Sequence, residues 1–140
     1  MYEIVSSVRR DYIADLARQD KRIDARTMDQ FREVSVEVGP IKSAQGSALV
    51  KIGKTQVIAG IKMEHAEPFP DKPDSGMLIV NAELLPLASP TFEPGRPDEN
   101  AIELARVVDR GIRESNAIDL DKLVIKSGED VWAVFIDIYV

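Results

Sequence analysis

Strand-like segments follow one another in the first half of the chain with no helix between them. Apolar and polar residues alternate in 34–38, and two β-prone runs, 47–52 and 56–63, flank the pair Gly53-Lys54. Alternation is typical of a strand, and such a short connection joins antiparallel neighbours. Because parallel neighbours need a crossover, usually a helix, we expect a sheet that is at least partly antiparallel, in an α+β rather than a doubly wound fold.

The other regular segments fit the same fold class. Residues 77–87, 123–125 and 131–140 are further strand-like runs. Val34, Val36 and Val38 share one side of their strand, and we expect that side to be buried.

An additional helix is predicted near the N-terminus, where Ser6 or Ser7 can act as its cap. The polar segment 19–33 that follows reads as a connection, with Ile23 and Phe31 as its expected apolar anchors and its arginines mostly solvated.

Composition narrows the class of protein. The chain has 140 residues, of which 44% are hydrophobic and 30% charged, as is ordinary for a globular domain. It has no cysteine, which excludes disulfides, thiolate metal sites and a cysteine nucleophile. No apolar run approaches the roughly 20 residues that span a bilayer, and no signal peptide is evident. We expect a cytoplasmic protein without a membrane partner.

The overall charge is acidic, with a net charge of −6 and a pI near 4.8. A broad nucleic-acid binder would instead cluster Lys and Arg on its surface. Any RNA site must therefore be small and focused, or shared with a more basic partner.

The segment 92–115 predicts a long amphipathic helix. Asp98 can cap its first amides and Asn116 can end it. The apolar residues of this helix fall within one arc of the helical wheel, as expected of a side packed on a core: Ala101, Leu104, Ala105, Val108 and Ile112.

The opposite side of this helix is charged. Arg106 and Arg110 are four residues apart, so their guanidinium groups project in the same direction and could hold neighbouring phosphates. Each arginine of the helix also has an acidic neighbour at pairing distance, in the pairs Glu103–Arg106, Asp109–Arg113 and Arg110–Glu114. Spacing alone leaves both alternatives open, and a solvated, self-paired face is the commoner one.

Two further groups have possible chemical roles. The only histidine, His65, lies beside Glu64 and Glu67, but these residues lack the ligand number and geometry of a zinc site, and we predict no metal site. Asp137, within the last apolar run, is expected to be a hydrogen-bonded structural residue rather than a catalytic acid.

Long stretches of the chain resemble one family, the RNase PH-like subunits of the archaeal exosome, and among them the larger, non-catalytic type. The stretches are GSALVKIGKTQVIAGIK, NAELLPLASPTFEPGRPDENAIELARVVDRGIRES, LDKLVI and VWAVFIDIYV, in the order of the family. The resemblance implies that residues 1–31 hold the extra N-terminal helix and its connection. Residues 32–140 would form the first half of an RNase PH-like domain, truncated at its C-terminus.

The resemblance also implies a function. Such a subunit pairs with a catalytic RNase PH-like subunit, three pairs close a hexameric ring, and RNA-binding cap subunits sit on one face. The ring degrades single-stranded RNA from its 3′ end with inorganic phosphate, which is used at the partner's site, so no cofactor is expected here.

The resemblance implies that Arg106 and Arg110 match the RNA-contacting arginines of the family. Arg96 lies where active relatives place basic residues, but Pro97 and Asp98 follow it here in place of a second basic residue. One alternative is a purely structural ring subunit, and another is an active phosphorolytic subunit with its catalytic groups downstream.

Overall fold

A computed structural model of the chain describes residues 7–140, which separate into two compact units. The first ends at Arg32 and the second comprises Glu33–Val140. In the first unit, helix α1 spans Ser7–Arg18. Ser7 is therefore a helical residue, and the alternative cap, Ser6, lies outside the described residues.

The connection after α1 is held by polar contacts, and the prediction that Ile23 and Phe31 anchor it is wrong. Both side chains are exposed, Phe31 to 88%. The connection is held together by Arg26 instead, whose side chain is only 19% exposed. Its Nε lies 2.7 Å from an Asp24 carboxylate oxygen, and its Nη1 donates a hydrogen bond to the Gln30 carbonyl at 2.7 Å. The segment folds on itself around this guanidinium. The other two arginines of the segment, Arg22 and Arg32, are exposed, so the expectation that its arginines are mostly solvated holds except at Arg26.

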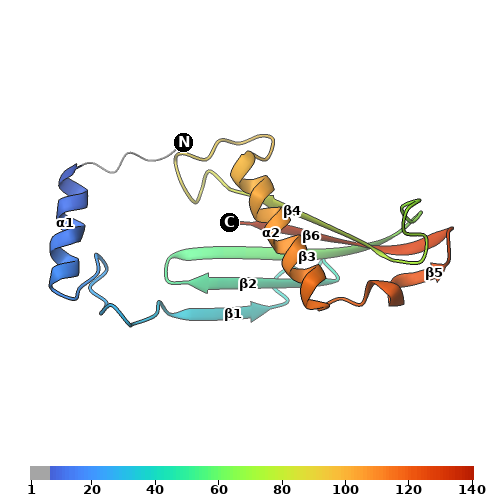
Figure 1. Cartoon of the computed structure of the whole chain (residues 1–140), viewed down its shortest axis with the longest axis horizontal. Coiled ribbons are helices and arrows are strands. Elements are labelled where there is room, and N and C mark those ends of the chain that lie inside the picture. Colours follow the sequence, from blue (N-terminus) through green and yellow to red (C-terminus); the bar gives the residue numbers. More distant parts are fainter. Residues whose placement is uncertain (1–6) are drawn as a thin grey trace. The chain divides into compact units, whose positions relative to one another are not determined.

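The second unit is built on one mixed sheet, in the order β1-β2-β3-β6-β4 with β5 paired to β6. Figure 1 shows these strands with helix α2 lying across them. The strands are β1 (Val34–Val38), β2 (Gly46–Ile52), β3 (Thr55–Ala66), β4 (Met77–Glu83), β5 (Val124–Lys126) and β6 (Asp130–Tyr139).

Strand pairing confirms the predicted α+β class. β2 and β3 form the expected antiparallel hairpin, and Gly53 in its turn has a φ of 61°, which glycine adopts without strain. Among the strands described between residues 34 and 139, only β4 and β6 pair in parallel, and helix α2 lies between them in the sequence. β4 ends at Glu83, four residues before the predicted boundary, although the Leu85 amide still donates to the Val140 carbonyl at 3.0 Å.

Helix α2 spans Glu99–Ser115 and has the predicted ends. The Asp98 side chain accepts a hydrogen bond from the Ala101 amide at 2.8 Å, and Asn116 ends the helix with a left-handed φ of 52°. The 3₁₀ helix η1, Leu120–Leu123, then leads into β5.

The core lies between α2 and the β4–β6 part of the sheet. Its buried residues are Leu78, Ala82, Val134, Ile136 and Ile138, and the apolar side of α2 packs against them, as predicted, through Leu104, Ala105, Val108 and Ile112. Near the start of β4, Gly76 donates its amide hydrogen to the Leu120 carbonyl at 2.8 Å, so strand and 3₁₀ helix lie in direct contact.

The predicted burial of one side of β1 is wrong. All five residues of this strand are exposed, and Val38 is 82% exposed. Val36 lies opposite Val50, which lies opposite Val57, and Val57 packs against the core. The valines thus share the side of the sheet that faces α2, but α2 packs at the β4–β6 end and β1 is the strand at the other edge.

Candidate nucleic-acid interface

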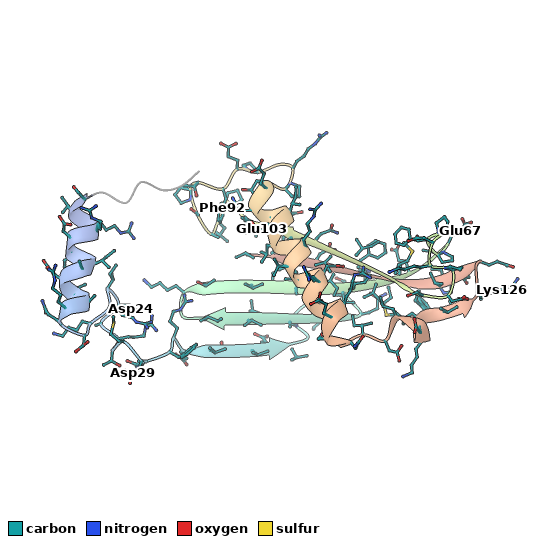
Figure 2. All side chains as sticks on the ribbon, in the orientation of Figure 1. Asp24, Asp29, Glu67, Phe92, Glu103 and Lys126 are labelled. Carbon is teal, nitrogen blue, oxygen red and sulfur yellow. The ribbon has the colours of Figure 1, made fainter. Side chains whose placement is uncertain are left out.

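The outward side of α2 carries the candidate arginines. Both Arg106 and Arg110 are exposed, and they line one shallow hollow of about 380 Å³. The other residues that line the hollow come from the first three turns of the helix: Glu99, Ile102, Glu103 and Val107. The structure therefore brings this predicted pair together on one surface, and Glu103 of this surface is labelled in Figure 2.

Arg110 forms one of the ion pairs predicted from spacing. Its Nε lies 2.7 Å from the Glu114 Oε1 atom, and both side chains are exposed. An exposed pair of this kind stabilises a helix by only about 0.3–0.5 kcal/mol. Glu114 therefore holds Arg110 weakly, and an anionic ligand can compete for the guanidinium.

Arg106 differs from its neighbour, because it makes no ion pair with any residue in the described part of the chain, 7–140. The predicted pair with Glu103 is therefore not formed, although both residues line the same hollow. A guanidinium without a partner keeps all five of its hydrogen-bond donors available for a ligand.

Arg113 has a structural role that sequence reasoning did not find. It forms the predicted pair with Asp109, at 2.8 Å, and its Nη2 also donates to the Leu78 carbonyl at 2.7 Å. This bond ties the last turn of α2 to β4. Periodicity along one helix carries no signal for such a contact, because the two residues lie far apart in the sequence.

Arg96 lies in the loop before α2 and lines another cavity. This cavity, of about 440 Å³, is formed by 83–86, 91–98 and Ala101. Figure 2 shows Phe92, another of its residues, in the loop at the start of α2. The residues that line it do not include Arg106 or Arg110, so Arg96 does not join the arginine pair in one hollow.

The start of α2 is already occupied by a carboxylate. The hydrogen bond from the Ala101 amide is the main cause that holds the pKa of Asp98 below its ordinary value, and the bond from the Asn100 side chain is the second. Asp98 therefore satisfies the positive end of the helix dipole, and phosphate binding would have to come from the arginine side chains rather than from these amides.

His65 lies in a cross-strand cluster of its own. Its Nδ1 is 3.1 Å from an Asp130 carboxylate oxygen, and its ring contacts Trp132 edge-on with centroids 4.1 Å apart. Within residues 7–140, no three His, Asp or Glu side chains are placed to hold a metal ion. The partners of His65 are thus Asp130 and Trp132.

Asp137 makes the hydrogen bond expected of it. Asn81 of β4 donates its side-chain Nδ2 to Oδ1 of Asp137 at 3.1 Å, across the parallel pair of strands. The aspartate is half-buried.

None of the helices described between residues 7 and 140 has the length and apolar character to cross a membrane.

Comparison with known proteins defines the class of this chain. Residues 30–140 match the model of the 3′ exoribonuclease family, domain 1, called RNase PH. The chain therefore belongs to the RNase PH family.

Particular relatives refine this assignment. The chain is 61% identical over 137 residues to the exosome complex component Rrp42 of Archaeoglobus fulgidus, which is 98% of this chain and 53% of the relative. It is 59% identical over 138 residues to the protein of the same name from Thermococcus kodakarensis, covering 99% of this chain and 51% of the relative. The chain thus spans about half the length of the curated relatives it matches.

Solved structures give the same result. A chain of the Archaeoglobus fulgidus exosome with RNA bound to the active site superposes with a TM-score of 0.89 at 63% identity, covering 94% of this chain and 52% of that one. An archaeal exosome core gives a TM-score of 0.80 at 55% identity, covering 94% and 49%. The predicted resemblance to RNase PH-like exosome subunits is confirmed, and so is the mixed-sheet α+β fold.

Proposed function

We propose that this chain is the N-terminal part of an archaeal exosome ring subunit that holds the RNA backbone at a site shared with a catalytic partner. The observation that carries the proposal is the exposed pair of Arg106 and Arg110 on one side of α2, in a chain whose net charge is −6. The sequence identity of 59–61% between this chain and proteins named exosome complex component Rrp42 supports the proposal that it is part of an exosome ring.

The geometry of the pair suits consecutive phosphates. Residues four apart on a helix are separated by about 6 Å along its axis and face the same way. Each guanidinium can give two parallel hydrogen bonds to one phosphate. Contacts of this kind position a strand without reading its sequence, so in this proposal single-stranded RNA is bound whatever its sequence.

In this proposal the subunit itself is non-catalytic. The partner RNase PH-like subunit supplies acid catalysis and binds inorganic phosphate, which attacks the 3′-terminal linkage, and cap subunits deliver the RNA in the cytoplasm. This chain then acts through Arg106 and Arg110, with Arg96 as a further contact in the preceding loop. Phosphate-dependent degradation by the full-length protein without its partner would contradict the non-catalytic role.

The test is the double variant Arg106→Ala/Arg110→Ala, made in the full-length protein and assembled with its catalytic partner. Each arginine should contribute about tenfold to RNA affinity, the value of a weak charged hydrogen bond. The slope of log affinity against log salt should fall by about 1.4, because each phosphate contact on a single strand contributes about 0.7. Fluorescence anisotropy with labelled RNA measures both quantities.

The matched control is Arg10→Ala/Arg18→Ala, which removes two exposed arginines from α1. It changes the net charge equally and should leave RNA affinity unchanged. If the α2 double variant binds RNA as tightly as this control does, the assignment of Arg106 and Arg110 to the RNA backbone is refuted.

One observation favours a second candidate, a purely structural role for this side of α2. Ile102 and Val107, in the same hollow, are 46% and 62% exposed. Exposed aliphatic side chains among charges suit a protein interface as well as a nucleic acid. In that case the double arginine variant would lose ring assembly, measured by light scattering, rather than RNA affinity within the ring.

A further inference from the structure

The arginine pair on α2 is bounded by carboxylates at both ends. Glu103 lies one turn before Arg106, and Glu114 lies one turn after Arg110. Glu99 lies a further turn before Glu103. Since one turn of helix rises about 5.4 Å, the positive part of this surface is about one turn long and is flanked by negative charge.

The two boundary residues act differently. Glu114 accepts a hydrogen bond from Nε of Arg110, and the two Nη groups of Arg110 remain available for a ligand. Glu103 makes no ion pair with Arg106 within residues 7–140, but it lines the same hollow. In the proposed function the strand runs along α2 with one phosphate at each arginine, which brings its flanking phosphates toward these two carboxylates.

We infer that Glu103 and Glu114 are specificity-determining residues that limit this surface to two phosphates of a bound RNA strand. This inference rests on the proposed function of Arg106 and Arg110. A carboxylate about 6 Å from a phosphate repels it, in water, by an amount equal to about a threefold change in affinity, and salt reduces this to about twofold. The surface thus holds a short section of backbone and opposes contact with the flanking phosphates.

The experiment uses the full-length protein assembled with its catalytic partner, without inorganic phosphate, so that RNA is bound but not degraded. Glu103→Gln and Glu114→Gln are compared singly and together. Glutamine removes the charge of Glu114 but keeps an oxygen that can accept the bond from Arg110. The matched control is Glu37→Gln, which removes an exposed carboxylate from β1.

Single-stranded oligoadenylates of increasing length are titrated over a range of salt concentrations. Each α2 variant should bind two- to threefold more tightly than the unmodified protein, and only oligonucleotides long enough to reach past the pair should show the gain. The gain of the double variant should shrink as the salt concentration rises, because salt screens the repulsion that the two substitutions remove. The Glu37→Gln control should not change either quantity.

Unchanged or weaker binding by the α2 glutamine variants would overturn the inference. If Arg106→Ala/Arg110→Ala still weakens binding in the same assembly, the proposed function stands and only the limiting role of the carboxylates fails. If the arginine variant also binds normally, the proposed function fails, and the inference fails with it.

Discussion

Gly76 occupies a position where a single methyl group should be destabilising. A Cβ atom added there would lie 2.5 Å from Cβ of Leu123, 3.0 Å from the Leu120 carbonyl oxygen and 3.1 Å from the Trp132 carbonyl oxygen. Carbon atoms in contact normally lie about 3.5–4.0 Å apart. Because two of these neighbours are backbone atoms and the third is a Cβ, none can move by rotating a side chain.

Gly76→Ala should therefore separate η1 from the start of β4 by about 1 Å. We expect a loss of about 1–3 kcal/mol from overpacking, and about 1 kcal/mol more if the bond from the Gly76 amide to the Leu120 carbonyl is broken. The total of about 2–4 kcal/mol is a large part of the 5–15 kcal/mol by which a domain is stable. It corresponds to a fall in Tm on the order of 10–20 °C.

The measurement is urea unfolding of the 140-residue chain, followed by circular dichroism and by fluorescence of Trp132, the only tryptophan. The control is the same chemical change at Gly111, inside α2, where an added Cβ meets nothing within 4 Å. Gly111→Ala should stabilise by about 0.5–1 kcal/mol, because alanine favours a helix. If Gly76→Ala changed stability by less than about 0.5 kcal/mol, the steric reasoning would be refuted.

Three other predictions concern α2 and the sheet. Arg113→Met should lower the free energy of unfolding, measured in urea, by about 1–2 kcal/mol, because it loses the bond to the Leu78 carbonyl. Arg110→Met should lower it by less than about 0.5 kcal/mol, and equal losses would contradict the anchoring role of Arg113. The pKa of Asp98 is lowered in the folded state, so its contribution to stability is present above about pH 4 and is lost as the pH falls through the folded value. Asp98→Asn should reduce the fall of Tm between about pH 4 and lower pH. An unchanged fall would contradict this contribution of the Asp98 carboxylate. Val36→Ala should change the unfolding free energy of this chain by about 0.5 kcal/mol or less, against about 2 kcal/mol for Val134→Ala; a large loss at Val36 would show that β1 is covered.

Features that depend on neighbours in sequence were predictable. The ends of α2 at Asp98 and Asn116 follow from local capping chemistry, and its apolar side follows from helical periodicity. The β2–β3 hairpin likewise follows from one short turn between two β-prone runs. In each case the physical cause acts over a few residues, so the sequence pattern contains it.

Features that depend on distant neighbours were not predictable. Alternation places Val36 on one side of β1, but it does not say whether another element covers that side. Phe31 is apolar, yet the connection around it is ordered by hydrogen bonds of Arg26. On α2, spacing predicts a partner for Arg106 as readily as for Arg110, and only the three-dimensional arrangement of side chains separates the two.

The central position of β6 has a consequence for the rate and order of folding. β6 lies between β3 and β4, and its register with β3 joins residues as distant in sequence as His65 and Trp132. The β1–β2–β3 meander can form early through local turns, but closing the sheet requires loops of much greater length, which slows folding. During synthesis, one edge of β3 and the edge of β4 that pairs with β6 therefore have no partner until residues 130–139 have been made. Unpaired strand edges of this kind favour aggregation.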